Sequence, residues 1–217
     1  MKILIYSDVH GNLPAFEKML KTEGACDQYI CLGDLVNYGP WSNECVDLAV
    51  SLSNSKILMG NHELAYINGF YLGSNPLAQA FFNKTYPNFD RIDLIKSFNI
   101  ELCLDKYICQ HTLNDLYVYP DTQIDLNMNY IIGHSHHQFY SKSNNYILYN
   151  TGSVGQNRKF INIINYLTYD TEKKIISMKS IEYNLDLLIN EMKRLSYSEE
   201  CLKYYLTKPF LNINFTS

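Results

Sequence analysis

The chain opens with the stretch that decides its fold, KILIYSDVHGNLPAF, residues 2–16. Residues 2–6 form a short apolar run, which is typical of a buried strand. Pro14 then stands where the first turn of a helix tolerates proline. The residues that follow place their apolar side chains on one helical face, at Leu13, Phe16, Met19 and Leu20. The stretch therefore predicts a strand, a polar loop and a helix.

The same alternation continues through the first sixty residues. We expect strands at 28–32 and 56–59 with a helix over 40–52 between them, and this β-α-β-α-β order favours a parallel sheet. The chain beyond is rich in strand signals, at 100–104, 107–111, 116–118, 129–132, 146–149, 160–169 and 174–183, with a hairpin turn at 170–173. One α/β domain with two sheets, spanning residues 1–217, is the simplest prediction.

Two segments fall outside this alternation. Residues 64–100 are rich in aromatics, with short helices expected near 76–85 and 90–98, and they could form a cap over a site. The helical spacing of Phe82, Tyr86 and Phe89 makes packing in the core the simpler expectation. Residues 185–217 are expected to form a C-terminal helical tail, with the helix over about 185–206.

Composition and charge narrow the class of protein. The chain has 217 residues, of which 47% are hydrophobic and 18% charged, a balance that excludes a disordered chain. The net charge is −4, which argues against a non-specific nucleic-acid binder. The six cysteines include no C-x-x-C pair and are expected to be buried hydrophobes. With no signal peptide or membrane-spanning run in the sequence, we expect a cytoplasmic protein.

Polar motifs follow five of the expected strands. They are SDVHGN (7–12), GD (33–34), GNHE (60–63), QHT (110–112) and GHSH (133–136). Ligands of α/β sheets bind beyond the carboxyl ends of the strands, so we expect all five motifs to meet in one crevice. Residues i and i+2 of an extended segment point the same way. That periodicity predicts that Asp8 acts with His10, and His134 with His136.

The motifs supply a mixed set of oxygen and imidazole ligands, namely Asp8, His10, Asp34, Asn61, His111, His134 and His136. These groups are too many for one zinc ion and too rich in nitrogen for calcium or magnesium alone. They suit two divalent ions, with manganese expected first and iron, nickel, cobalt or zinc as alternatives. The ligand set includes only two carboxylates, so the loaded site stays positive and favours an anionic ester.

The ordered series D-x-H, G-D, G-N-H-E, H and G-H-x-H resembles the calcineurin-like metallophosphoesterases, and in particular the small phosphoesterases of the YfcE type. The segments 7–15, 33–40 and 150–158 are similar to segments of that group, and the resemblance covers about residues 1–183. It implies a four-layer α/β/β/α sandwich, with two mixed sheets flanked by helices and a two-metal site.

The resemblance also implies residue roles. One ion would be held by Asp8, His10 and His136, and the other by Asn61, His111 and His134, with Asp34 bridging the two. A bridging hydroxide would attack phosphorus in line. His62 matches the family's catalytic histidine, which the best-known YfcE-type members lack, so its presence favours hydrolysis.

Two further residues are candidates for contact with the substrate. Arg158 could clamp a phosphate oxygen, although bracing of a loop is its simpler role. The simplest role of Asn12 is that of a residue at the entry of a helix, and its side chain could also face the site. His137 follows a better ligand candidate and is expected to point away.

The sequence leaves several functions open. The first is a phosphodiesterase or phosphomonoesterase acting on a small molecule or nucleotide. A nuclease of the same family is an alternative, as is a catalytically silent scaffold like the retromer subunit that shares the fold. A protein phosphatase ranks lower, because Ser7 stands where those relatives carry glycine. The expected partner is a small phosphate ester, and no membrane partner is expected. The aromatic-rich surface suggests a homodimer.

Overall fold

The computed structural model describes residues 1–211 of the chain. Its elements run in the order β1 (Lys2–Tyr6), α1 (Leu13–Glu23), β2 (Gln28–Cys31), α2 (Ser42–Ser51), β3 (Ser55–Ile57), α3 (Asn61–Asn68), α4 (Pro76–Thr85), η1 (Tyr86–Asn88), α5 (Ile92–Ile95), β4 (Glu101–Leu104), β5 (Tyr107–Gln110), β6 (Asn129–Ile132), β7 (Gln138–Ser143), β8 (Tyr146–Thr151), β9 (Ile163–Asp170), β10 (Ile175–Glu182), α6 (Asp186–Arg194) and α7 (Glu199–Leu206).

The strands form two mixed sheets of five strands each. The first has the order β10-β9-β1-β2-β3, and the second has the order β4-β5-β6-β8-β7. β1, β2 and β3 are parallel to one another, as the opening of the sequence predicts. β9 runs antiparallel to β1 and pairs with β10 in the predicted hairpin. The predicted architecture of two mixed sheets flanked by helices is confirmed.

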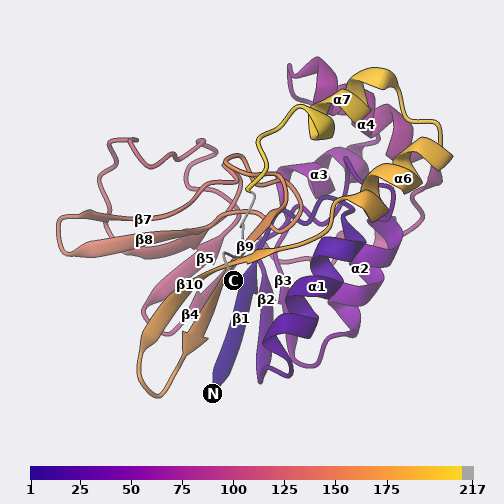
Figure 1. Cartoon of the computed structure of the whole chain (residues 1–217). Coiled ribbons are helices and arrows are strands. Elements are labelled where there is room, and N and C mark those ends of the chain that lie inside the picture. The colour runs from indigo at the N-terminus through magenta and orange to yellow at the C-terminus, as the bar shows by residue number, and fades with distance from the viewer. Residues whose placement is uncertain (212–217) are drawn as a thin grey trace.

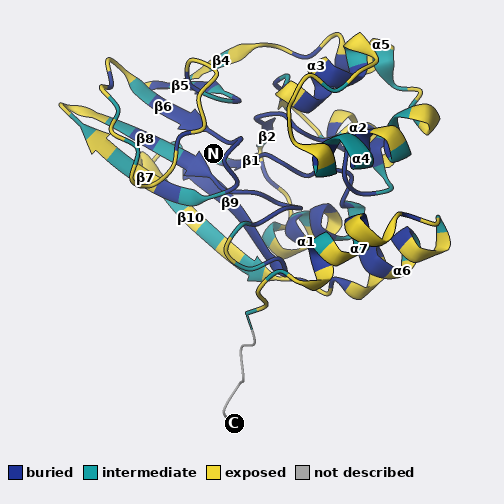
Figure 2. Cartoon of the chain, turned by 90° about the horizontal axis from the view of Figure 1, so that it is seen from above, coloured by how far each residue is buried: buried dark blue, intermediate teal, exposed yellow. Residues whose placement is uncertain are grey.

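Three clusters of apolar side chains separate the layers. The helices α1, α2, α3, α4, α6 and α7 pack on the outer face of the first sheet, on the right of Figure 1. A second cluster lies between the sheets and includes Ile5 of β1 and Ile131 of β6. On the outer face of the second sheet, the irregular segment 111–128 contributes Leu113, Val118 and Leu126 to a third cluster. Figure 2 shows how the inner strands are buried between these layers.

Several predicted elements are wrong in type or extent. Residues 116–118 form no strand, because this stretch crosses the outer face of the second sheet as an irregular segment. Strand β7 was not predicted, since its sequence QFYSKS is polar and only Phe139 is buried. The helix expected over 90–98 is limited to α5, Ile92–Ile95. Helix α3 was also missed, because its first turn is the polar motif GNHE itself.

The C-terminal tail and the segment 64–100 pack on the same side of the molecule. The helix expected over 185–206 is broken into α6 and α7 at Ser196, whose φ of 55° no helix accommodates. Phe81 of α4 contacts the rings of Tyr197 and Tyr205 from this tail. Phe82 is buried, and Tyr86 and Phe89 are partly buried against the same apolar cluster, as expected for core packing. The cap role of 64–100 stays a prediction, and residues 212–217 of the predicted tail lie outside the described residues.

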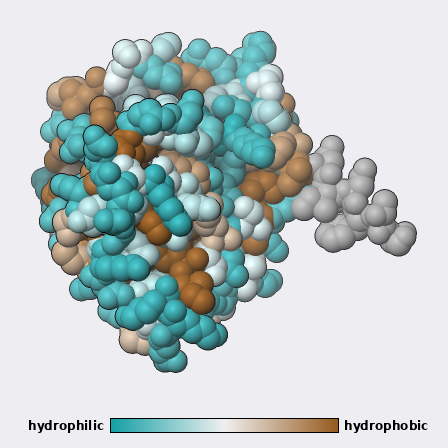
Figure 3. Space-filling view, turned by 90° about the vertical axis from the view of Figure 1, so that its left-hand side faces the viewer, coloured by the Kyte–Doolittle hydropathy of each residue, from teal (hydrophilic) through white to brown (hydrophobic). Residues whose placement is uncertain are grey.

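The surface over the second sheet carries a mixture of side chains. Figure 3 shows hydrophobic residues on this face as separate spots among hydrophilic ones. Tyr140 of β7 and Met128 are among the exposed large side chains of the molecule. Homodimer formation therefore stays a prediction. Among residues 1–211, no helix combines the length and the apolar character needed to cross a bilayer.

Candidate metal centre

The five polar motifs meet at the carboxyl ends of strands from both sheets. Asp8 and His10 follow β1, Asp34 follows β2 and Asn61 begins α3 after β3. The second sheet supplies His111 after β5, and His134 and His136 after β6. Two groups of these residues place their ligand atoms within 4.8 Å of one another, namely Asp8, His10, Asp34 and His136, and Asp34, His111 and His134. The predicted convergence is therefore present, with Asp34 in both groups.

The backbone that aims these side chains is left-handed, and the extended geometry expected from the i, i+2 spacing is wrong. Asp8 and His10 have φ values of 56° and 51°, and His134 and His136 have φ values of 67° and 59°. Asp34 also has a positive φ of 59°. Asp and His tolerate this region better than most residues. Hydrogen bonds between loops hold it, since the N–H groups of Asp8 and His10 donate to Gly33 O and Asp34 O, both at 3.0 Å.

In the first cluster, two imidazole nitrogens face each other. His10 Nε2 and His136 Nε2 are 3.1 Å apart. Their Nδ1 atoms lie 3.1 and 3.0 Å from the carbonyls of Val36 and Gln156. Because a carbonyl only accepts, each Nδ1 must carry the proton. Both Nε2 atoms then direct lone pairs at the same space, and a cation between them would satisfy both.

Asp8 completes the first cluster. Its Oδ2 accepts hydrogen bonds from the Ser7 hydroxyl and from the N–H of His134, the latter at 3.0 Å. Its Oδ1 is buried and has no hydrogen-bond partner among the described residues. That oxygen lies 3.1 Å from His136 Nε2 and 3.7 Å from His10 Nε2. An orphaned, buried carboxylate oxygen beside two imidazole lone pairs fits a divalent metal ion.

The second cluster repeats this arrangement. His111 Nδ1 donates to Leu32 O at 2.8 Å, so Nε2 is the ring nitrogen that faces the site. That Nε2 lies 3.1 Å from both Asn61 Oδ1 and His134 Nδ1, and 3.3 Å from Asp34 Oδ2. The same Asp34 oxygen lies 3.8 Å from His10 Nε2 in the first cluster. One carboxylate oxygen therefore stands between the two clusters.

Charges within the site keep its ligands in the right protonation states. Burial would raise the pKa values of Asp8 and Asp34, but the surrounding imidazoles lower both below their ordinary value. Burial lowers the pKa values of His134 and His136 to about 4, so both are neutral. His111 is the exception: burial opposes its charge, but Asp34 and Asp8 raise its pKa to about 10. A metal ion that binds there displaces a proton, so affinity should rise with pH.

Glu63 has a positional role that the sequence analysis missed. Its carboxylate accepts hydrogen bonds from the N–H groups of Asp34, Leu35 and Gly60 at 2.7, 2.7 and 2.8 Å, and from Val36 N–H at 3.3 Å. Burial and the charge of Asp34 raise the pKa of Glu63 to about 6. The side chain fixes the loop that carries Asp34 against the start of α3. Its place in GNHE was the only sequence signal.

We expect Glu63→Ala to destabilise the fold and to weaken metal binding. The change leaves buried N–H donors without an acceptor, which costs about 3 kcal/mol or more in the free energy of unfolding. Chemical denaturation and metal content of the purified protein measure both effects. Glu199→Ala, at the exposed start of α7, is the matched control. A variant as stable as the control would show that the loop does not depend on this carboxylate.

The remaining predicted site residues have the following places. His62 is buried, and its ring lies 4.9 Å from that of His10 between centroids. Arg158 lies next to this site, with its N–H 3.5 Å from His136 O and its Nη1 donating to the Tyr204 hydroxyl at 2.6 Å. Asn12 caps α1 through Ala15 N–H and donates to Gly155 O and the Tyr183 hydroxyl. Its amide is fully engaged, and its contact with substrate stays a prediction.

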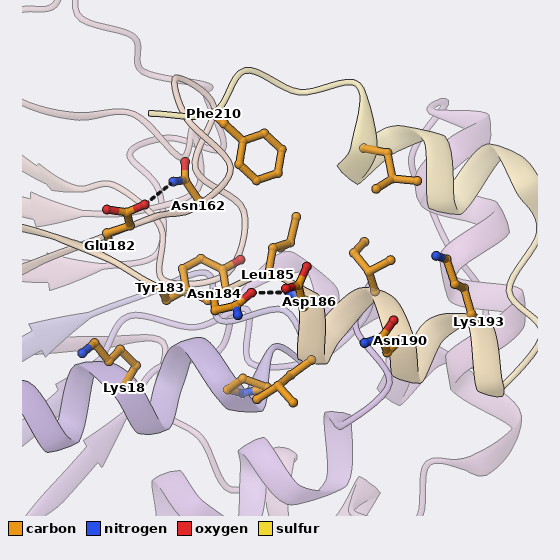
Figure 4. Close-up of a pocket in the computed structure, with 14 residues that line it drawn as sticks. Lys18, Asn162, Glu182, Tyr183, Asn184, Leu185, Asp186, Asn190, Lys193 and Phe210 are labelled. Carbon is orange, nitrogen blue, oxygen red and sulfur yellow. Dashed lines mark hydrogen bonds between the residues drawn. The ribbon is translucent and has the colours of Figure 1, made fainter. Parts of the chain in front are cut away.

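One sizeable cavity among the described residues lies away from these clusters. It has a volume of about 780 Å³ and lies among the ends of α1, β10, α6 and the segment around Phe210 (Figure 4). Lys18 and Lys193 line it, and Asn162 donates to Glu182 at its rim at 3.1 Å. None of the predicted metal ligands lines this cavity, so its size gives it no part in the candidate site.

Metal binding should stabilise the folded protein. Mn²⁺ at a hundred times its dissociation constant should add about 2.7 kcal/mol to the metal-stripped protein, since only the folded state assembles the ligands. In a chain of this size that raises the melting temperature by roughly 5–10 °C. His136→Ala should lose much of the shift, and its neighbour His137→Ala should keep it. Equal shifts in the two variants would contradict the assigned ligand.

Comparisons with known proteins agree with this geometry. The family model described as calcineurin-like phosphoesterase matches residues 1–153. An uncharacterized protein of Methanocaldococcus jannaschii, MJ0912, is 30% identical over 84% of this chain and 88% of its own length. A metallophosphoesterase from Sphaerobacter thermophilus shares the fold with a TM-score of 0.80 at 23% identity, over 95% of this chain and 98% of that one. The YfcE phosphoesterase of E. coli aligns with a TM-score of 0.50 at 21% identity, over 85% of this chain and all of that one. The ordered motifs, their convergence and the family match lead to one conclusion: the chain belongs to the calcineurin-like phosphoesterase family.

Proposed function

We propose that the protein is a hydrolase of phosphate esters that uses two divalent metal ions, with manganese the first candidate. The position of Asp34 Oδ2, between His10 Nε2 at 3.8 Å and His111 Nε2 at 3.3 Å, is the observation that carries this proposal. One ion would be held by Asp8, His10 and His136, and the other by Asn61, His111 and His134. Asp34 would bridge them. When bound, the ions would activate water and neutralise the charge on the phosphate.

His62 is the proposed catalytic residue, and its neighbours set its tautomer. Asn37 Oδ1 accepts from Tyr38 N–H at 2.8 Å and from the Thr85 hydroxyl at 3.3 Å. The amide nitrogen of Asn37 therefore faces His62 Nδ1, at 2.9 Å, and donates to it. With Nδ1 as acceptor, the proton of the neutral ring sits on Nε2. Burial lowers the pKa of His62 to about 3, so the ring would act as a neutral donor to an oxygen on which charge develops.

Arg158 is the proposed binding residue for a phosphate oxygen. Among residues 1–211, its guanidinium donates one hydrogen bond, to the Tyr204 hydroxyl, which leaves further N–H donors of the fork available. The pKa of Arg158 is raised against the effect of burial by neighbouring tyrosines and by Asp8. A charged guanidinium beside the metal-ligand clusters favours an anionic substrate. Asn12 stays a weaker candidate for this role.

Hydrolysis of p-nitrophenyl phosphate and bis-p-nitrophenyl phosphate tests the proposal directly. Metal-stripped protein should turn over neither ester, and activity should return as Mn²⁺ is added. The ratio of the two rates then assigns the monoester or diester class. Folded protein that hydrolyses neither ester with Mn²⁺, Ni²⁺ or Co²⁺ would overturn the proposal and favour a silent scaffold. Cleavage of nucleic acid in place of both esters would favour the nuclease alternative. A cytoplasmic location stays a prediction.

A further inference from the structure

Two tyrosines beside the metal-ligand clusters expose their rings. Tyr117 and Tyr119 lie in the irregular segment between β5 and β6 and are 54% and 41% exposed. Their rings are parallel to within 12°, with centroids 6.2 Å apart. The Tyr117 ring lies over the ligand His134, with 4.0 Å between centroids. These two parallel rings, here called the tyrosine platform, therefore begin at a metal ligand and continue outward.

The backbone holds the tyrosine platform in place. Val118, between the two tyrosines, is 1% exposed and packs with Leu113 and Leu126 on the second sheet. Its burial turns both tyrosine rings to the opposite side. A turn closes the segment, since Tyr119 N–H donates to the Thr122 hydroxyl at 2.9 Å and Tyr119 O accepts from Thr122 N–H at 3.1 Å. The exposed rings are thus preorganised, which lowers the entropic cost of stacking on them.

A cavity adjoins the tyrosine platform and reaches a metal ligand. It has a volume of about 530 Å³, and the residues that line it include His136, His137, Pro120, Lys159 and Phe160. The His137 ring stands edge-on to Tyr119, with 5.6 Å between centroids and an angle of 73°. This volume is typical of sites for small molecules. It offers room for the organic part of an ester whose phosphate lies at the clusters.

Cations from a separate part of the chain lie next to the same region. Arg158 donates to the Tyr204 hydroxyl. Lys208 Nζ lies 4.6 Å from the centre of the Tyr204 ring. Three hydrogen bonds fasten the segment that carries Lys208: Ile161 N–H donates to Pro209 O at 3.0 Å, Leu211 N–H donates to Asn162 Oδ1 at 2.9 Å, and Asn162 Nδ2 donates to Leu211 O at 3.0 Å. Aromatic faces and positive charge therefore occur together beside the ligand clusters.

We propose that the substrate is a phosphate ester whose alcohol carries a flat aromatic ring, and that this ring stacks on Tyr117 and Tyr119. The inference rests on the proposed function and adds the substrate class to it. Exposed tyrosine rings stack on any flat π system, and stacking on a base discriminates by a factor of roughly 10 or more. A nucleobase and a simple aryl group share this chemistry, and the substrates below distinguish them.

Adenosine 5′-monophosphate and ribose 5-phosphate form the test pair, since both are esters of the primary 5′-oxygen of a ribose and they differ by the base. Metal-stripped protein should bind the nucleotide about tenfold more tightly by calorimetry, and the Mn²⁺-loaded protein should show the same preference in kcat/KM. Their 5′-phosphate methyl esters serve if the enzyme prefers diesters. Tyr119→Ala should abolish the preference, and Tyr119→Phe should retain it. Tyr140→Ala, on the exposed face of β7, is the matched control and should retain it.

The outcomes separate this inference from the proposed function. Metal-dependent turnover with equal affinity for both esters, or a preference that survives Tyr119→Ala, would overturn the ring site alone. A preference in binding without any turnover would retain the ring site and overturn the hydrolysis. A comparison of benzyl phosphate with cyclohexylmethyl phosphate shows whether the site recognises a simple aryl group as well as a nucleobase. An equal advantage for benzyl phosphate assigns the site to aromatic rings in general, and an advantage for the nucleotide alone assigns it to a nucleobase.

Discussion

Asp34→Asn is expected to release both metal ions and to lower kcat/KM by at least about a thousandfold, because without the ions no activated water forms at neutral pH. In the wild type, the backbone N–H of His62 donates to Asp34 Oδ1 at 2.9 Å. The amide keeps an oxygen that can accept this hydrogen bond. It replaces the charged Oδ2 by a neutral NH2 group, which offers no lone pair to the ions that His10 Nε2 and His111 Nε2 would hold on either side of it. Atomic absorption of the purified variant measures the metal content.

A surface carboxylate supplies the control for that change. Asp105→Asn removes an acid that pairs with Lys174 at 2.9 Å, away from the clusters, and should leave metal content and activity unchanged. Wild-type activity in Asp34→Asn would refute the two-metal mechanism. Loss of one ion with the other retained would show that Asp34 belongs to a single site.

His62→Ala is expected to keep the metal ions and to lower kcat by about 10²- to 10⁴-fold, the range for loss of a positioned acid–base group. No hydrogen bond of the His62 side chain goes to a predicted ligand, since its Nδ1 accepts from Asn37. Metal content should therefore match the wild type. Loss of metal in this variant, or wild-type turnover, would contradict the assigned role.

The pH profile separates His62 from the ligands. Burial lowers the pKa of His62 to about 3 from its ordinary 6.5, so its neutral form prevails at every pH well above 3. If kcat falls as the pH drops from 7 to 5 (the acidic limb of the profile), this fall reports metal binding and water activation. His62→Ala should retain that limb at a lower amplitude. A limb that disappears with His62 would show that protonation of this ring controls the rate.

The sequence predicts much of this site because ligand types and strand ends coincide. Asp8, Asp34 and His134 each follow a short apolar run, so their convergence follows from the sheet. Their orientation could not be predicted, because it depends on positive φ values held by hydrogen bonds from other loops. Glu63 was missed for a related reason. Its four acceptor contacts are to backbone N–H groups, which no side-chain pattern records.

The errors in the predicted fold lie in segments whose structure depends on long-range contacts. Residues 116–118 form a short apolar run like that of a strand, but Val118 anchors a loop to the second sheet while its neighbours stay exposed. The polar strand β7 is held by its pairing with β8 along its whole length. Ser196 divides the C-terminal helices although its sequence context is helical. In each case long-range contacts prevailed over local propensity.

The left-handed backbone of the ligand residues also shapes how this chain can evolve. At residues 8, 10, 34, 134 and 136, glycine and asparagine fit the backbone best. Aspartate reaches glycine, and histidine reaches asparagine, by a single base change. A lineage released from metal chemistry is therefore expected to drift to those residues first, gaining stability as it loses ligands. Descendants of this fold that serve only as scaffolds should carry that signature at these five positions, which a survey of their sequences can count.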